Sequence, residues 1–216
     1  MIERLVPSAV AVAEQFGAPG EAELFPDEQA RIARAVAKRR QEFSSVRWCA
    51  RQAMAQLGVP AAAVLPGERG APQWPTGVVG SMTHCEGYRA AALARSGTFL
   101  GIGIDAEPHG ALPQGVLQAV SLPEERKWLD CAPGGVHWDR LLFSAKESTY
   151  KAWYPLTGRW LGFEDALIHI DPAGTFTATF LVAPPQVAGR TLTQLTGRWL
   201  VSQSLVLTAI VLTASP

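Results

Sequence analysis

With 216 residues, the chain is long enough for one large domain or two small ones, each with an apolar core. Apolar side chains make up 48% of the residues, which is typical of a globular protein and excludes a disordered one. The 19 basic and 19 acidic side chains cancel, which argues against a general nucleic-acid-binding protein but leaves room for a local anion site.

Cysteine spacing and apolar runs favour a cytoplasmic protein without membrane contact. Cys49, Cys85 and Cys131 lie far apart and form no CxxC pair, so we expect reduced thiols rather than disulfides or a zinc site. We find no signal peptide at the N-terminus, and no apolar run approaches the roughly 20 residues of a membrane helix. The apolar segment 205–214 is short and β-branched, and predicts a strand.

The first half predicts helices and then strands. A helix beginning at Pro26 is expected to continue through the basic residues 38–40. A second helix is expected over 44–58, with Ser44 or Ser45 as its N-cap. A loop rich in Gly and Pro follows. Strands are then predicted over residues 78–84, 88–94 and 100–106.

The second half repeats this order. A short helix is expected over 121–130 with Ser121 as N-cap, and the longest helical pattern spans 138–154. Its apolar side consists of Leu141, Leu142, Ala145, Thr149 and Ala152. Antiparallel strands are predicted over 167–171, 175–182 and 198–212. Two similar α+β lobes follow from this order, with a boundary predicted between an N-terminal lobe, 1–106, and a C-terminal lobe, 107–216.

Two carboxylates end the strand in the segment GIGIDAEPH, residues 101–109. Asp105 and Glu107 are two residues apart, so both point to one face of a strand. They repel each other unless water or a cation separates them, and Mg²⁺ prefers such ligands. Gly101 and Gly103 suit a place where a backbone or a ligand approaches closely. The plain alternative is a strand that ends in a polar turn.

A second charged cluster, FSAKESTYK, lies within the long helix at residues 143–151. Glu147 and Lys151 are four residues apart, which is the favourable order for an ion pair. An ordinary surface pair is the alternative. The apolar flanks instead favour a site, with Glu147 as a third oxygen ligand and with Lys146 and Lys151 neutralising phosphate oxygens.

Two smaller clusters in the first half also suit an anionic ligand. Thr83 and His84 place a hydroxyl beside an imidazole, and both can donate to a phosphate; the alternative is a histidine in a turn. Arg47 and Arg51 share one helix face and repel each other unless an anion lies between them; the alternative is two solvated arginines.

In order along the chain, these motifs resemble the signature of the Sfp-type 4′-phosphopantetheinyl transferases. GIGIDAE at 101–107 and FSAKESTYKAW at 143–153 match that family's pattern (V/I)G(I/V)D…E followed by (F/W)xxKExxxK. GSMTHCEGYRAAAL at 80–93 and RWCARQAM at 47–54 resemble its histidine motif and its arginine helix. VVGSMTHC and KAWYPLTG look closest to the enterobactin synthetase component D-like branch and its actinobacterial relatives.

The resemblance implies an enzyme that moves the 4′-phosphopantetheine of coenzyme A to a serine of an apo acyl or peptidyl carrier protein. It implies Mg²⁺ dependence, with Mn²⁺ as the alternative metal, and release of adenosine 3′,5′-bisphosphate. It also implies the family's α+β fold, a pseudo-dimer of two similar α/β lobes, each with a small antiparallel sheet packed by helices. We expect coenzyme A in the cleft between the lobes, and a monomer with no nucleic-acid or membrane partner.

The resemblance assigns roles around the metal. By resemblance, Asp105, Glu107 and Glu147 hold Mg²⁺ against the pyrophosphate, and Lys146 and Lys151 contact the phosphates. Glu147 is also the position proposed as general base for the carrier serine, directly or through a water. Asp105, Glu147 and Lys151 therefore form the expected catalytic set.

The remaining coenzyme A contacts fall in the first half. By resemblance, His84 with Thr83 binds a phosphate, and Arg47 and Arg51 grip the nucleotide end. The family often carries a lysine in the loop where this chain has Arg69, and we expect Arg69 to make that phosphate contact. One departure is Ala106 between the two acids, which cannot be a ligand, so water must fill that position.

Two other classes of function stay open. One is a different Mg²⁺-dependent enzyme of nucleotides, either a phosphohydrolase or a transferase, because the same carboxylates and lysines would serve it. The other is a non-catalytic domain that binds coenzyme A. The segment HGALPQGVLQAV at 109–120 is a candidate surface for docking the carrier, with Val116 and Leu117 as its apolar residues.

Overall fold

The computed structural model describes residues 1–17 and 22–214 as two antiparallel sheets, each covered by one long helix. The three-stranded sheet has the order β1-β5-β4, with bounds Ala11–Phe16, Tyr88–Arg95 and Val78–Cys85. The five-stranded sheet has the order β6-β12-β11-β8-β7, with bounds Phe99–Pro108, Leu205–Thr213, Gln194–Ser202, Thr175–Phe180 and Ala166–Asp171.

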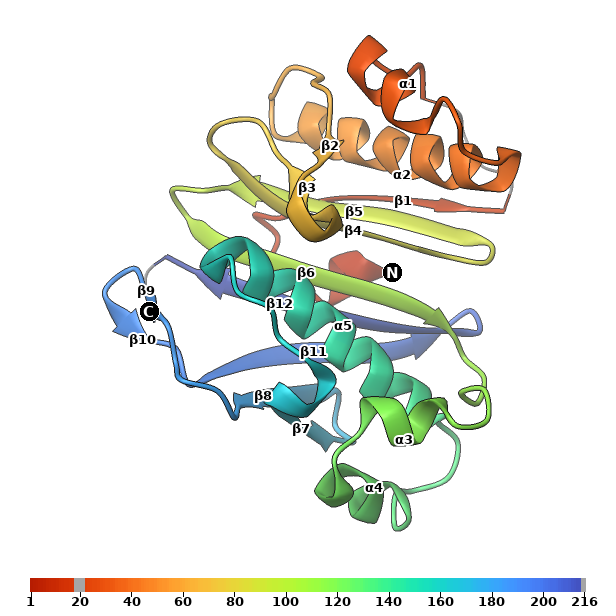
Figure 1. Cartoon of the computed structure of the whole chain (residues 1–216), viewed down its shortest axis with the longest axis vertical. Helices are drawn as coiled ribbons and strands as arrows, with labels where there is room; N and C mark the ends of the chain where they lie inside the picture. The colour runs from red at the N-terminus through yellow and green to blue at the C-terminus, as the bar shows by residue number, and fades with distance from the viewer. Residues whose placement is uncertain (18–21, 215–216) are drawn as a thin grey trace.

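The long helices are α2 and α5, and each lies across one sheet (Figure 1). The helices have the bounds α1 Pro26–Ile32, α2 Ala37–Gln56, α3 Val116–Val120, α4 Pro123–Leu129 and α5 Trp138–Thr157. Short 3₁₀ helices are η1 Ile2–Arg4, η2 Glu68–Gly70 and η3 Phe163–Asp165. Two-residue pairs are β2 Leu65–Pro66 with β3 Pro72–Gln73, and β9 Gln186–Val187 with β10 Arg190–Thr191. The predicted fold class is confirmed.

Apolar side chains form three cores. One lies between α5 and the five-stranded sheet and includes Trp153 and Phe176. Another lies between α2 and the three-stranded sheet, around Met54. The third joins the two sheets and includes Tyr88 and Ile104. The predicted apolar side of the long helix is confirmed, because all five of its residues are fully or almost fully buried. Each helix is therefore held to its own sheet by hydrophobic burial.

Strands β4 and β6 meet where the two sheets join, and hydroxyl groups bridge them. Ser81 Oγ accepts the N–H of Ile104 at 3.1 Å, and Thr83 Oγ1 accepts the N–H of Ala106 at 3.1 Å. The two hydroxyls alternate with the strand period, so they match alternate amide groups of β6. Buried amides that have no neighbouring strand on that side are satisfied in this way.

Two glycines of β6 allow α5 to approach the strand, as the sequence predicted. A Cβ on Gly103 would lie 2.0 Å from the carbonyl oxygen of Ser148 and 2.7 Å from the amide nitrogen of Ala152. A Cβ on Gly101 would lie 3.2 Å from the side chain of Leu156. The close approach places the middle of α5 against the carboxylate end of β6.

We expect Gly103→Ala to destabilise the protein by about 1–3 kcal/mol, because helix backbone, which cannot rotate away, blocks the added methyl group. The measurement is urea unfolding followed by far-UV circular dichroism. Gly97→Ala is the matched control, since a Cβ there meets nothing within 4 Å. Equal midpoints for the two variants would contradict the packing described here.

Three local predictions of the first half are corrected. No strand is predicted before the first helix, yet β1 pairs with β5. The helix that begins at Pro26 ends at Ile32, and α2 begins separately at Ala37. Ser44 and Ser45 lie inside α2 and cap nothing; Ser45 Oγ donates to a carbonyl one turn earlier.

The break between α1 and α2 has a physical reason. Glu28 in α1 pairs with Arg47 and Arg51 in α2. In one continuous helix, residues 28 and 47 would be about 28 Å apart. The chain must therefore turn back for the buried carboxylate to reach the two arginines.

Two further predictions concern the middle of the chain. Ser121 is not the N-cap of the second-half helix; Leu122 is, and its N–H donates to Glu125 Oε2 at 2.7 Å. The boundary at residue 106 stays a prediction. Because β6 pairs with β12 along its length, sheet membership by itself changes before Phe99.

Both halves contain the same buried carboxylate arrangement. Glu28 and Glu125 each occupy the third position of a short helix that begins with proline, and each accepts the N–H of its own helix cap. Glu28 also accepts the N–H of Val64 and Glu125 that of Ile168. A basic residue of the long helix completes each set: Arg47 at 3.4 Å in the first half and Lys146 at 2.9 Å in the second. The repeat expected from element order alone therefore extends to individual side chains.

Candidate active site

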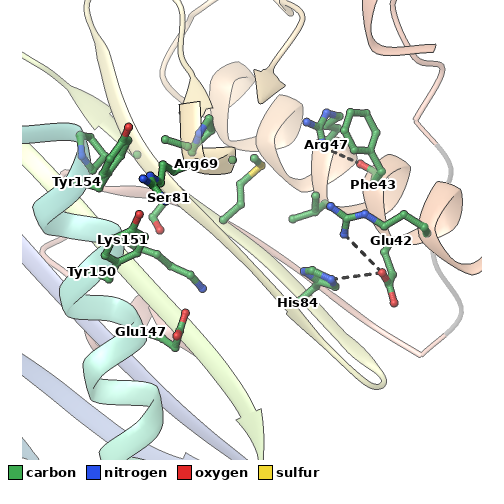
Figure 2. A pocket seen from close by; sticks show the side chains of 18 residues that line it. Glu42, Phe43, Arg47, Arg69, Ser81, His84, Glu147, Tyr150, Lys151 and Tyr154 are labelled. Carbon is green, nitrogen blue, oxygen red and sulfur yellow. Dashed lines mark hydrogen bonds and ion pairs between the residues drawn. The ribbon is translucent and has the colours of Figure 1, made fainter. Parts of the chain in front are cut away.

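A cleft of ≈ 310 Å³ opens between α2, the η2 segment, β4 and α5 (Figure 2). In Figure 2, α5 carries Glu147, Tyr150, Lys151 and Tyr154 on one side, and α2 carries Glu42, Phe43 and Arg47 on the other. The residues that line the cleft are Arg39, Glu42, Phe43, Val46, Arg47, Arg69, Gly70, Ala71, Pro72, Gly80, Ser81, Met82, His84, Glu147, Tyr150, Lys151, Tyr154 and Pro155. Cationic groups from both halves of the chain thus converge on one cavity.

Arg47 lines the cleft but is held by the protein. Its Nε and Nη2 donate to the carbonyl of Val64 at 3.0 and 2.7 Å, and its Nη1 donates to the carbonyl of Phe43 at 3.2 Å. Burial lowers the pKa of Arg47 to about 10, and Glu28 opposes that shift. The guanidinium is therefore fixed at the cleft wall.

Arg51 is not among the residues that line the cleft, and its role at the nucleotide end stays a prediction. Its guanidinium pairs with Glu28, donates to the carbonyl of Glu23 at 2.8 Å and lies over the ring of Phe25. The anion between the two arginines is the internal carboxylate of Glu28, which neither sequence alternative included.

His84 lies at the cleft beside two charged residues of α2. Glu42 Oε2 is 3.5 Å from His84 Nε2 and 3.6 Å from Arg39 Nη1. Burial lowers the pKa of His84, and Glu42 opposes this shift. Sequence reasoning missed Arg39 and Glu42. Helical spacing could have indicated Arg39, because residues 39, 43 and 47 are each four apart and lie on the same face of α2.

We expect the affinity for adenosine 3′,5′-bisphosphate to rise as the pH falls below about 6.5, the usual pKa of histidine. Burial lowers the pKa of His84, so the free imidazole gains its proton only in this acidic range. A bound anion favours the protonated form, so binding and protonation strengthen each other. Isothermal titration calorimetry across pH 5 to 8 measures this. The ligand's own phosphate protonates in the same range, so His84→Gln is the reference. A difference between the two proteins that does not change with pH would exclude this role.

The two carboxylates of β6 both face α5, as predicted, while Ala106 points into the core between the sheets. Asp105 Oδ1 accepts Lys151 Nζ at 2.7 Å and Thr83 Oγ1 at 3.3 Å. Asp105 Oδ2 is buried without a hydrogen-bond partner among the described residues. Burial, and next the charge of Asp105, raise the pKa of Glu107. The face of β6 that lies against α5 therefore carries the unpartnered oxygen of Asp105 and the Glu107 carboxylate, which Asp105 repels.

Glu147 lies one helical turn before Lys151 but makes no hydrogen bond or salt bridge with the residues that the structure describes. Lys151 binds Asp105 instead. Burial, and next the charge of Asp105, raise the pKa of Glu147, while Lys151 lowers it. The Glu147 carboxylate therefore lines the cleft without a hydrogen-bonding partner among the described residues.

The three predicted ligands are electrostatic neighbours but do not form a complete metal cluster. Within residues 1–17 and 22–214, no three His, Cys, Asp or Glu side chains are grouped closely enough to hold an ion. Two observations still fit a divalent cation: the unpartnered buried oxygen of Asp105, and the mutual repulsion that Asp105 imposes on Glu107 and Glu147.

Two predicted phosphate ligands have other partners. Thr83 is buried against Asp105 and the β6 backbone and does not line the cleft. Lys146 is buried beside Glu125 and donates to the carbonyls of Phe163 at 2.6 Å and Ala166 at 3.0 Å. Burial lowers the pKa of Lys146, and Glu125 opposes that shift. Both side chains hold the site's framework through these contacts, and their phosphate contacts stay predictions.

Arg69 lines the cleft, as its predicted role requires, in the left-handed region with φ 56°. Its guanidinium lies 5.1 Å from the ring centre of Trp160, which is exposed.

Cys85 is unsuited to nucleophilic chemistry, because burial raises the pKa of its thiol to about 12.

The fold and the cleft together define a class: a protein with two sheet-and-helix halves, whose shared cleft is lined by arginines from α2, a histidine from β4, and Glu147 and Lys151 from α5. Two family models match the chain. Residues 27–94 match the 4′-phosphopantetheinyl transferase N-terminal domain, and residues 101–208 match the 4′-phosphopantetheinyl transferase superfamily. The chain belongs to this superfamily.

Curated relatives agree over the full length. The 4′-phosphopantetheinyl transferase Svp of Streptomyces mobaraensis is 55% identical over 221 residues, covering 99% of this chain and 90% of that protein. The transferase Npt of Nocardia iowensis is 52% identical, with 97% and 99% covered. The transferase PptT of Mycobacterium tuberculosis is 50% identical, with 98% of each covered. The prediction of a 4′-phosphopantetheinyl transferase is confirmed.

A membrane was not expected as a partner. Throughout the described residues, none of the helices combines the length and the hydropathy that crossing a lipid bilayer requires.

Proposed function

We propose that this chain transfers 4′-phosphopantetheine from coenzyme A to a serine of an apo acyl or peptidyl carrier protein, and that the reaction depends on Mg²⁺. The observation that carries this proposal is the cleft, where Arg47, His84 and Lys151 face a carboxylate, Glu147. A phosphoryl-type transfer needs positioning and charge neutralisation more than covalent help from the enzyme.

The chemistry balances without an enzyme nucleophile. The serine oxygen bonds to the β-phosphorus of coenzyme A, and the bond from that phosphorus to the bridging oxygen breaks. Adenosine 3′,5′-bisphosphate leaves with that oxygen. The serine proton goes to a base, and Glu147 suits this role because its carboxylate lines the cleft and has no hydrogen-bonding partner among the described residues.

Asp105 and Glu107 are the residues that would hold the metal, with Glu147 as the third candidate. When bound, Mg²⁺ would neutralise the charge of the pyrophosphate. Lys151 supplies a fixed positive charge at the same place through its contact with Asp105. Arg39 and Arg69 are the cleft cations that remain for the other phosphates of coenzyme A, and His84 is a hydrogen-bonding group beside them.

The test separates transfer from hydrolysis. We expect adenosine 3′,5′-bisphosphate to form only when an apo carrier protein is present, in equal amount to the carrier modified, as measured by liquid chromatography. Release from coenzyme A without a carrier would instead favour a phosphohydrolase. Tight binding of coenzyme A without any release would favour a binding domain.

Several finer assignments stay predictions. They are the enterobactin synthetase component D-like branch, the monomeric state, the cytoplasmic location, the lack of nucleic-acid partners, and Mg²⁺ rather than Mn²⁺.

The carrier-docking surface at 109–120 is another prediction. Val116 and Leu117 are half-buried there, and either residue changed to Asp should raise the carrier KM without weakening coenzyme A binding.

A further inference from the structure

Arg140, which sequence reasoning did not single out, distributes its guanidinium over three acceptors next to the site. Its Nη1 donates to Glu107 Oε2 at 2.9 Å. Its Nε donates to the carbonyl of Gly110 at 3.0 Å, and its Nη2 donates to the carbonyl of Ala111 at 2.8 Å. Only a planar fork of donors can make these three contacts at once, so a lysine cannot replace it fully.

The neighbours of Arg140 in α5 bind the same segment. Asp139 Oδ2 accepts the N–H of Leu112 at 2.7 Å. The N–H of His137, the N-cap of α5, donates to the ring of His109 at 3.1 Å. The chain that follows β6 is therefore fastened to the start of the helix that carries Glu147 and Lys151.

Arg140 is also the one hydrogen-bonding partner of the Glu107 carboxylate within the described part of the chain. It occupies Oε2 and leaves Oε1 available. Its side chain is 16% exposed and that of Glu107 is 20% exposed, so this pair is not a solvated surface contact. Carboxylates that ligate metals are commonly oriented by such a partner.

We propose that Arg140 is a positioning residue: it orients Glu107 for the metal ion and fixes the segment His109–Leu112 against α5. This rests on the metal role of Glu107 in the proposed function. One rigid helix thereby sets the positions of Glu107, through Arg140, and of Glu147 directly.

The test measures metal affinity and local opening, not turnover. Mn²⁺ is titrated into the protein with saturating coenzyme A and followed by electron paramagnetic resonance, and hydrogen exchange is measured over residues 109–116. We expect Arg140→Met to weaken Mn²⁺ binding about 10- to 100-fold and to speed exchange in that segment. Arg140→Lys should restore affinity to within a few-fold but not the slow exchange, because one ammonium cannot reach all three acceptors.

Asp139→Ala separates the two effects. It removes the acceptor of the Leu112 N–H without touching Glu107, so we expect faster exchange with unchanged Mn²⁺ affinity. Arg159→Met is the matched control, because Arg159 also donates to a loop carbonyl, that of Ala183, but lies past the other end of α5. It should change neither quantity at the site.

The outcomes distinguish the two proposals. If the unmodified protein binds no Mn²⁺, the proposed metal site fails. If it binds Mn²⁺ and Arg140→Met binds equally well, the positioning role is wrong. Should Arg140→Met not fold by circular dichroism, Arg140→Gln replaces it under the same criteria, because its shorter, neutral side chain supplies no cationic donor to Glu107.

Discussion

Replacing Asp105 by alanine is expected to lower kcat/KM for carrier modification at least about 10³-fold, the scale on which a preorganised charge group acts in catalysis. The carboxylate binds Lys151 Nζ at 2.7 Å, and its other oxygen is buried without a partner among the described residues. Its loss would leave Lys151 unpaired and would remove the acceptor proposed for the metal. Initial rates of holo-carrier formation measure the effect.

Two further variants make this result specific. Asp105→Asn keeps the size of the side chain and one oxygen but loses the charge, so it should lose most of the same activity. Asp171→Ala is the control, because Asp171 is an exposed acid at the end of β7. Should Asp105→Ala fold normally and keep more than a tenth of the activity, Asp105 would not be part of the catalytic set.

The second large effect is on stability. Lys146→Met should lower the free energy of unfolding by about 3–5 kcal/mol, because it leaves the buried charge of Glu125 without its partner. Side-chain exposure of the pair is 3% for Lys146 and 1% for Glu125, so solvent does not screen the loss. Urea unfolding at pH 7 measures this change.

The control for this pair is Glu124→Gln, in the same turn of α4 but exposed. It should change the stability by less than about 0.5 kcal/mol. The double variant Lys146→Met with Glu125→Leu should lose less than the sum of the single changes, because no buried charge is left unpaired. A loss below about 1 kcal/mol for Lys146→Met would show that the pair does not hold the second half together.

Much of the fold followed from residue patterns. The long apolar side of α5 and the alternating pattern of the second sheet are strong periodic signals. The apolar side is confirmed, whereas the predicted segment 198–212 divides into β11 and β12 at residues 203 and 204. The close approach inferred from the glycines of β6 is also present, because Gly103 lies against the backbone of α5 and Gly101 against the side chain of Leu156. The predicted N-caps of the helices were wrong. Ser44, Ser45 and Ser121 are typical caps by type, but Leu122 with Glu125 caps α4 and a turn set by tertiary pairing begins α2.

For the site, the sequence indicated residue types but not their partners. Residue type revealed that Arg51 and Lys146 must face anions, but not that these anions are internal carboxylates, Glu28 and Glu125. Long-range partners of this kind depend on how α1 and α4 fold back, which spacing along the chain does not encode. The partner of Thr83 was hidden for the same reason, because its hydroxyl accepts an N–H of the neighbouring strand β6. Arg140 was missed because its acceptors lie about 30 residues earlier.

The most direct measurement is intact-mass spectrometry of an apo carrier protein after incubation with this protein, coenzyme A and Mg²⁺. We predict a gain of one phosphopantetheine on the carrier, absent with EDTA and absent with Asp105→Ala. Unmodified mass for several unrelated apo carriers, with the unaltered protein folded and binding coenzyme A, would contradict the transfer proposed here.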